Sequence, residues 1–203
     1  MIAIIDYKAG NLRSVERALR HLDLECVITR DSNEIFKAER VIFPGVGAAG
    51  KAMETIIENG IDEVIREVVR AGVPFMGICL GTQIILEESE EDDAKCLGII
   101  SGTTRRFPEM GEKIPHMGWN TLHVRRDHPI LHGIEKDASF YFVHSYYPDP
   151  ADASDIIAET DYGISFPSAI GRNNVFATQF HPEKSGRFGL KMLKNFSTWD
   201  GKS

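Results

Sequence analysis

The chain has 203 residues, 42% of them hydrophobic and 26% charged, which is ordinary for a globular protein with one core. Its formal net charge of −7 gives no electrostatic reason to expect nucleic acid or an anionic membrane as a partner. No run is long enough to span a membrane and the N-terminus lacks the basic region of a signal peptide, so we expect a cytoplasmic protein.

The first half of the chain alternates apolar runs with amphipathic segments. The apolar runs predict strands at Ile2–Ile5, Glu25–Thr29 and Arg40–Phe43. Helical periodicity predicts helices at Asn11–Leu22, Ala48–Glu58 and Ile61–Ala71. A further, short helix is expected between the second and third strands. This β-α-β order predicts a parallel sheet with right-handed crossovers.

Glycines follow the third predicted strand, in Pro44-Gly45-Val46-Gly47-Ala48. Ligands bind at the carboxyl ends of parallel strands, where glycines let backbone N–H groups approach closely. Beside a nucleophile at the end of the next strand, this segment is a candidate oxyanion loop. The alternative is an ordinary strand-to-helix turn.

The central motif is Gly77-Ile78-Cys79-Leu80-Gly81, between an apolar run at Val73–Ile78 and a helix start at Thr82–Glu87. A G-x-C-x-G pattern between a strand and a helix is typical of a nucleophile elbow. The glycines leave room for the tight turn, and the amino end of the helix favours a thiolate. A buried structural cysteine is the alternative, but the glycines and both flanking elements favour a nucleophile.

The remaining chain is read as loops, short strands and one helix. The acidic segment Glu87–Lys95 is predicted to be a solvated loop. Short alternating segments predict hairpins at the sheet edge, namely Leu97–Ile100, Asn120–Val124, Ser139–Val143, Ile156–Thr160, Ser168–Ile170 and Val175–Gln179. A last helix is expected at Phe188–Phe196. Because no repeat or linker marks a boundary, we expect a single α/β domain over residues 1–203.

A thiolate nucleophile needs a general base and a group that orients it. Among the seven histidines, His181 follows a predicted strand and precedes Pro182-Glu183. If the backbone stays extended, residues two apart point the same way, so Glu183 can orient the imidazole. The alternative is a surface histidine beside a solvated glutamate. No cysteine or histidine spacing resembles a metal site, so we expect neither a metal nor another cofactor.

Together, G-I-C-L-G-T-Q, P-G-V-G-A and Q-F-H-P-E-K-S resemble, in family order, the class I, triad-type glutamine amidotransferases. The resemblance implies a mostly parallel, flavodoxin-like sheet and a Cys79–His181–Glu183 triad that hydrolyses glutamine to glutamate and ammonia through a thioester. It also implies that the N–H of Leu80 and one from Val46 or Gly47 bind the oxyanion. The implied substrate-binding residues are Gly45, Gly47, Gln83, Ser145 and Tyr146.

Three further stretches resemble the glutaminase subunits of imidazole glycerol phosphate synthases: Asp6–Leu12, Pro115–Asn120 and Tyr141–Tyr146. This resemblance implies a heterodimer with a separate (β/α)₈ cyclase, which uses the ammonia to make imidazole glycerol phosphate and an aminoimidazole carboxamide ribotide in histidine biosynthesis. It assigns Asn11, Met117, Trp119 and Lys184 to the partner interface. For Trp119, the alternative is an aromatic side chain that covers its own sheet.

Other functions stay open at this stage. Within the family, the chain could serve anthranilate or aminodeoxychorismate synthase. Outside it, an elbow cysteine could act on esters or peptides, or Cys79 could be a core residue of a flavodoxin-like binding module that has no catalytic activity.

Overall fold

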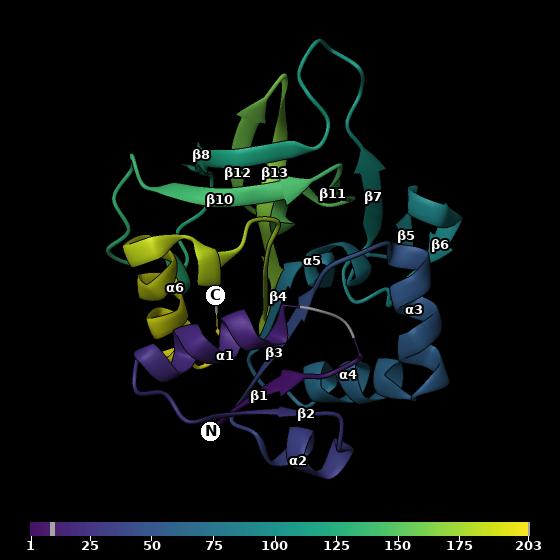
Figure 1. Cartoon of the computed structure of the whole chain (residues 1–203), viewed down its shortest axis with the longest axis vertical. Coiled ribbons are helices and arrows are strands. Elements are labelled where there is room, and N and C mark those ends of the chain that lie inside the picture. Colours follow the sequence, from purple (N-terminus) through teal and green to yellow (C-terminus); the bar gives the residue numbers. More distant parts are fainter. Residues whose placement is uncertain (9–10, 203) are drawn as a thin grey trace.

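The structure is a computed structural model that describes residues 1–8 and 11–202. Ala9, Gly10 and Ser203 lie outside the described residues, so the motif Asp6–Leu12 is described only in part. The main feature of the described part is an eight-stranded sheet in the order β2-β1-β3-β4-β14-β13-β12-β9, with helices packed against it (Figure 1).

The parallel half of this sheet follows the order β2-β1-β3-β4-β14. Its strands are β1 (Ile2–Ile5), β2 (Cys26–Thr29), β3 (Arg40–Gly45), β4 (Phe75–Cys79) and β14 (Val175–Thr178). This is the strand order of flavodoxin-like, doubly wound folds, in which ligands bind at the carboxyl ends of the strands. The prediction of a mostly parallel sheet is therefore confirmed.

Antiparallel strands extend the sheet, as predicted from the short segments of the second half. They are β13 (Ile164–Arg172), β12 (Ile156–Tyr162) and β9 (His123–Val124). A separate pair, β8 (His116–Thr121) and β10 (Ser139–His144), lies across the upper part of the molecule in Figure 1. The third sheet contains β11 (Tyr146–Pro150), β7 (Gly102–Arg106), β5 (Glu88–Ser89) and β6 (Ala94–Lys95).

Helices cover both faces of the parallel strands. One core cluster packs α1 (Leu12–His21) and α6 (Gly186–Thr198) against the sheet. The other packs α2 (Ser32–Lys37), α3 (Ala49–Glu58) and α4 (Ile61–Arg70) against the opposite face. In α4 the buried side chains are Ile61, Ile65 and Val68, the helical spacing that gave the prediction. Among the described residues, no helix is both long and apolar enough to cross a bilayer.

Two local predictions are wrong. The acidic segment is not a solvated loop, because Glu88–Ser89 pairs with both β6 and β7 and a 3₁₀ turn, Glu91–Asp93, follows. The segment Leu97–Ile100 is not a strand, because its N–H groups donate to carbonyls of residues 84–86 instead of to a neighbouring strand. The strands β7 and β11 were not predicted; they are polar or rich in proline.

Candidate active site

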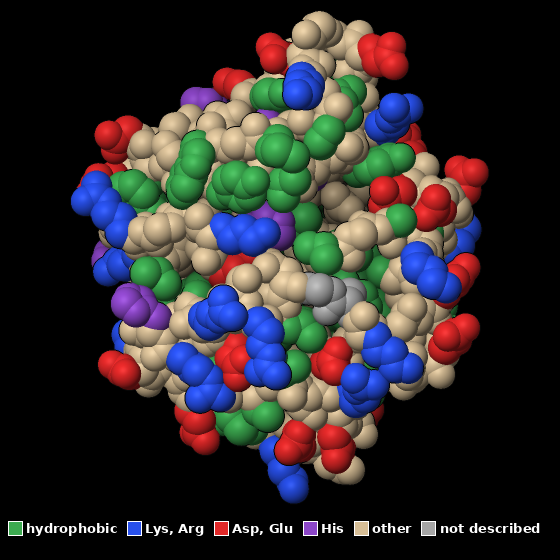
Figure 2. All heavy atoms as spheres, in the orientation of Figure 1, with side chains coloured by type: hydrophobic (Ala, Val, Ile, Leu, Met, Phe, Trp, Pro, Cys, Tyr) green, Lys and Arg blue, Asp and Glu red, His purple; other side chains and the backbone are tan. Residues whose placement is uncertain are grey.

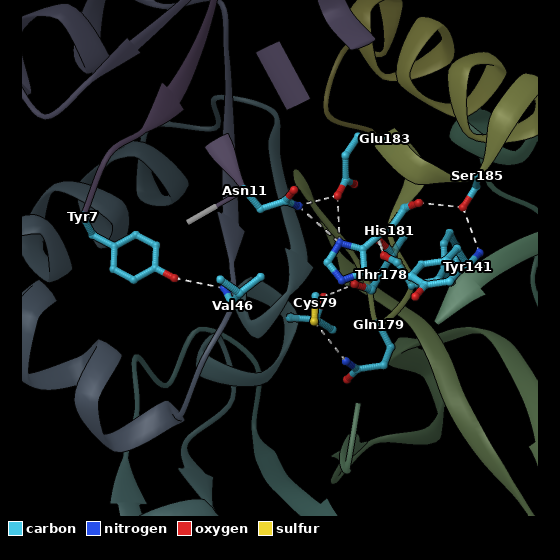
Figure 3. A network of polar contacts seen from close by, with 12 residues as sticks. Tyr7, Asn11, Val46, Cys79, Tyr141, Thr178, Gln179, His181, Glu183 and Ser185 are labelled. Carbon is cyan, nitrogen blue, oxygen red and sulfur yellow. Dashed lines mark hydrogen bonds and ion pairs between the residues drawn. The ribbon is translucent and has the colours of Figure 1, made fainter. Parts of the chain in front are cut away.

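The predicted nucleophile, base and oxyanion loop meet at one edge of the parallel sheet. Cys79 ends β4, the Val46–Gly47 loop follows β3, and His181 follows β14. Since β3 and β14 are the neighbours of β4 in the sheet, their carboxyl ends bring these residues together (Figure 3).

The turn at Cys79 has the strained geometry of a nucleophile elbow. Cys79 has φ 55° and ψ −105°, which is outside the usual regions for a residue with a side chain. The helix α5 (Leu80–Ile84) begins directly after it, earlier than the predicted start at Thr82. A Cβ on Gly81 would lie 2.1 Å from the carbonyl oxygen of Phe43, and one on Gly77 would lie 2.9 Å from that of Gly81. Close packing at the turn therefore explains both glycines.

The base side of the site is a buried hydrogen-bonded group. His181 is fully buried, and its Nδ1 lies 2.8 Å from Oε1 of Glu183. The same oxygen accepts a hydrogen bond from Nδ2 of Asn11 at 2.5 Å. The condition of an extended backbone is not met here, because Pro182–Lys184 forms a 3₁₀ turn. That turn brings the carboxylate back to the imidazole, and Pro182 suits its first position.

The imidazole of His181 lies beside Cys79, and both residues line the same cavity (Figure 3). Burial alone would lower the pKa of His181, but the contacts with Cys79 and with Glu183 outweigh burial and raise it to about 9. Since Nδ1 faces Glu183, Nε2 is left for the sulfur, and Nε2 has no hydrogen bond of ordinary geometry within the described residues. The raised pKa favours the imidazolium form of His181 at neutral pH, beside the sulfur of Cys79.

The oxyanion side is arranged differently. The N–H of Val46 donates to the hydroxyl of Tyr7 at 3.3 Å, and Figure 3 places Tyr7 on the far side of Val46 from Cys79. Tyr7 is buried and stacks on Phe43, with ring centroids 4.9 Å apart. Leu80 is the first residue of α5, where an N–H has no partner within the helix. Among the predicted oxyanion donors, the N–H of Val46 is therefore bound to Tyr7 in this structure.

A cavity of about 350 Å³ opens above the sulfur. Residues predicted from the sequence line it, namely Val46, Gly47, Cys79, Leu80, Gln83, Ser145, Tyr146 and His181. Others were not predicted, namely Glu91, Pro115, Val143 and His144. Gly45 lies behind the loop, where a Cβ would come within 2.7 Å of the Tyr7 hydroxyl and 2.8 Å of Cβ of Leu80. The cavity has the size of a small-molecule site.

Glu91 supplies a carboxylate to this cavity. Its Oε2 accepts a hydrogen bond from the N–H of Ala49 at 2.7 Å, at the start of α3. Burial raises the pKa of Glu91, and no salt bridge to it occurs among residues 1–8 and 11–202. No sequence signal singles out Glu91, because it lies in an acidic segment whose composition predicts a solvated loop.

A second missed residue, Gln179, lies against the nucleophile. It is fully buried, and its Nε2 lies 3.8 Å from Sγ of Cys79. Its Oε1 accepts a hydrogen bond from Nε2 of Gln83 at 3.2 Å. The available signal was its position two residues before His181, since alternate residues leaving a strand share a face.

The predicted interface residues divide into two groups. Met117 and Trp119 are 63% and 59% exposed on β8, and Lys184 lies with its ammonium 5.9 Å from the ring centre of Tyr141 on β10. Figure 2 shows hydrophobic side chains gathered over this β8–β10 face. Asn11, in contrast, is tied to Glu183 inside the site. Within the described part of the chain, no group of three His, Cys, Asp or Glu residues is placed to hold a metal ion.

The sequence is similar to a protein-family model and to individual proteins over nearly its whole length. A family model described as glutamine amidotransferase class-I matches residues 3–198. A protein named imidazole glycerol phosphate synthase subunit HisH, from Nitratidesulfovibrio vulgaris (strain DP4), is 53% identical over 97% of this chain and 95% of its own length. The protein of the same name from Methanocaldococcus jannaschii is 50% identical, over 97% of this chain and 98% of its own length.

Solved structures share the fold at low sequence identity. A chain from the structure of PurLQS from Thermotoga maritima superposes with a TM-score of 0.78 at 18% identity, covering 97% of this chain and 96% of that one. With the family match, this confirms the predicted class I amidotransferase fold.

Proposed function

Because the chain belongs to the class I glutamine amidotransferase family, and within it to the HisH subunits of imidazole glycerol phosphate synthase, we propose that Cys79, His181 and Glu183 are its catalytic triad. Its function is that of the glutaminase subunit in histidine biosynthesis. The observation that carries the triad is that Cys79 and His181 line one cavity, with Nδ1 of His181 held by Glu183 at 2.8 Å.

The reaction follows from this geometry. The Cys79 thiolate attacks the side-chain amide carbon of glutamine, and the imidazolium of His181 gives its proton to the departing ammonia. The neutral imidazole then takes a proton from water, which attacks the thioester and releases glutamate and the thiolate. Glu183 holds the ring in orientation and stabilises its charged form, because its carboxylate is bound to Nδ1.

The oxyanion of both tetrahedral intermediates would be bound by the N–H of Leu80 and by one N–H of the Val46–Gly47 loop. The Val46 N–H must leave Tyr7 to take part. Gly47 has φ +101° with open space around its Cβ position, a conformation in which glycine allows such a rearrangement.

The cavity also suggests how the amino-acid end of glutamine is held. Glu91 is the only carboxylate among the described residues that line it. A free amino acid carries an α-ammonium, which forms a charge-assisted hydrogen bond with a carboxylate. We therefore assign Glu91 to the α-ammonium, and Gln83 with the backbone of Ser145 and Tyr146 to the rest of the substrate.

The subunit name of the relatives implies a partner subunit. We propose that the partner is a (β/α)₈ cyclase, that the two form a heterodimer in the cytoplasm, and that residues 1–203 form one amidotransferase domain. Met117, Trp119 and Lys184 would face the cyclase, because large exposed apolar side chains of this kind are enriched at interfaces.

Glutamate release from glutamine, measured with and without the matching cyclase loaded with a ligand analogue, tests this function. We expect strong release that depends on the cyclase and disappears in Cys79→Ala, a loss of more than about 10⁴-fold as for other removed nucleophiles. The variant should still bind the cyclase, since a buried thiol is exchanged for a methyl group. Retained hydrolysis in Cys79→Ala would disprove the nucleophile, and no release with the cyclase would point to a chorismate enzyme as the partner.

A further inference from the structure

Gln179 occupies a position that the triad mechanism does not use. It directly follows β14, and its side chain is fully buried between Gln83 and Cys79. Its backbone N–H is bound to the carbonyl of Ser168 on the neighbouring strand at 2.9 Å, so the position of the side chain is set by the sheet. Figure 3 shows the amide directed at the sulfur.

The orientation of this amide follows from the groups around it. The backbone oxygen of Tyr146 can only accept, so Gln83 must turn its NH₂ group toward it, at 3.1 Å. The same NH₂ group faces Gln179 at 3.2 Å, which requires the oxygen of Gln179 on that side. The NH₂ group of Gln179 is consequently the end that lies 3.8 Å from Sγ of Cys79.

We propose that Gln179 is a catalytic residue of this glutaminase, whose side-chain N–H donates to the Cys79 thiolate while its oxygen fixes the amide of Gln83. This inference rests on the proposed function, because it assigns a role to the sulfur as nucleophile. A charged acceptor gains more from a buried donor than a neutral one does, so the contact favours the thiolate over the thiol.

The donor acts at the steps in which the sulfur carries charge. Before attack it stabilises and aims the thiolate. When the S–C bond forms and the C–N bond breaks, the sulfur loses that charge and the contact weakens. When water adds to the thioester and the S–C bond breaks, the electron pair returns to the sulfur, and the N–H of Gln179 receives the leaving thiolate.

The second contact gives Gln179 an effect on the substrate. Since both N–H groups of Gln83 are taken by Tyr146 and Gln179, the oxygen of Gln83 is the end that remains for the cavity. That oxygen can bind only a donor group of glutamine, either its α-ammonium or its amide NH₂. Loss of Gln179 would let the Gln83 amide rotate and would raise KM as well as lower kcat.

The test measures the reactivity of Cys79 in the whole chain, independently of glutamine hydrolysis. Wild type, Gln179→Glu and Gln179→Met are treated with iodoacetamide across a pH series, and alkylation of each cysteine is followed by peptide mass spectrometry. We expect Gln179→Glu to slow alkylation of Cys79 at neutral pH by about tenfold and to move its pH profile upward, because a carboxylate replaces the donor beside the sulfur. Gln179→Met, similar in size but without a donor, should slow it by a smaller factor.

Ser168→Ala is the matched control. Its side chain is buried on the adjacent strand. Its one hydroxyl partner within the described part of the chain is Thr160, which keeps its bond to the carbonyl of Thr121. It should leave the pH profile of Cys79 alkylation unchanged. The alkylation rates of Cys26 and of Cys96 should each be the same in wild type and in every variant.

Wild-type alkylation and the profile of Gln179→Met separate the outcomes. A wild-type Cys79 no more reactive at neutral pH than Cys26 and Cys96 would overturn the proposed function itself. A reactive wild-type Cys79 whose profile is unchanged in Gln179→Met, whatever the melting temperature, would overturn the role of Gln179 alone. Should Gln179→Glu fail to fold, Gln179→Met decides, together with the KM and kcat of its complex with the cyclase.

Discussion

The two sides of Cys79 are built in different ways. On one side, His181 and Glu183 are buried and bonded to each other, and Asn11 binds the same carboxylate. On the other side, Val46 is 36% exposed and its N–H is bound to Tyr7 rather than directed at the sulfur. The base side is assembled in this structure, whereas the proposed oxyanion side would need a rearrangement of one peptide group.

This difference indicates where activity is controlled. Forming the thiolate requires only the buried side, which is held by hydrogen bonds in a region of low dielectric. Stabilising the tetrahedral intermediate requires the exposed side, and oxyanion donors contribute strongly to acyl transfer. A chain of this kind would bind glutamine and keep its nucleophile ready, but turn over slowly until a partner rearranges the Val46–Gly47 loop.

The largest effects are expected on the assembled side. Replacing His181 with Ala should lower glutamine hydrolysis in the complex about as much as loss of the nucleophile. In the proposed mechanism its imidazole takes the proton of the thiol and then gives a proton to the departing ammonia. Glu183→Gln should cost less, about 10²- to 10⁴-fold, because it keeps the shape but removes the charge that stabilises the imidazolium. Steady-state kinetics with saturating cyclase measure both. A Glu183→Gln effect equal to or larger than that of His181→Ala would contradict these roles.

The elbow, the pairing of His181 with Glu183 and the parallel sheet could be predicted because their signals are local. Gly77, Cys79 and Gly81 lie within one turn, and His181 and Glu183 are separated by a single proline. The contacts of Gln179 and Tyr7 could not, because each joins distant segments, such as the bond from Val46 to Tyr7 across 39 positions. Glu91 was missed for another reason, since its acidic neighbours resemble a solvated surface and only the strand pairing of β5 brings it to the cavity.

The buried histidines provide a contrast with His181 in their response to pH. Burial lowers the pKa of His116 and His128 to about 4 and that of His144 to about 3, from an ordinary value of 6.5. Between pH 6.5 and 4 the unfolded chain therefore binds more protons, so the free energy of unfolding falls as the pH falls. For His181, raised to about 9, the sign is opposite, and its contribution is lost as the pH rises through 9.

Urea unfolding at pH 7 and pH 5 measures how far the free energy of unfolding falls as the pH is lowered. We expect a loss of about 1 kcal/mol for each buried histidine, which is half of the roughly 2 kcal/mol that the 1.5 pH units between 6.5 and 5 would give at about 1.4 kcal/mol per unit, because these side chains are only partly shielded from water. His128→Gln should reduce the slope, whereas His21→Gln, at an exposed site, should not. A stability that stays constant from pH 7 to pH 5 would rule out neutral buried histidines.

Tyr7→Phe tests the exposed side directly, with a smaller expected effect. It removes the hydroxyl that accepts the Val46 N–H while keeping the ring stacked on Phe43. The freed N–H can then turn toward the oxyanion, so glutamine hydrolysis by the isolated chain should rise, by about two- to tenfold for one weak hydrogen bond. Activation by the cyclase should shrink by a similar factor. Tyr162→Phe, which removes a hydroxyl bonded to the carbonyl of Lys113, is the control. A basal rate that falls or stays constant would show that Tyr7 does not restrain the loop.

The smallest effect on the isolated chain is expected on the β8–β10 face. Trp119 is 59% exposed and contacts Tyr141 edge-on, with ring centroids 6.0 Å apart. Truncation to Ala should change the free energy of unfolding by no more than about 0.5 kcal/mol, because an exposed side chain adds little to the core. In the complex it should weaken cyclase binding by at least about tenfold, as expected for an aromatic anchor at an interface. Calorimetry of the chain alone and titration with the cyclase separate the two effects. A large drop in melting temperature with unchanged binding would instead make Trp119 a structural cover for its own sheet, and the docking face would have to be sought elsewhere.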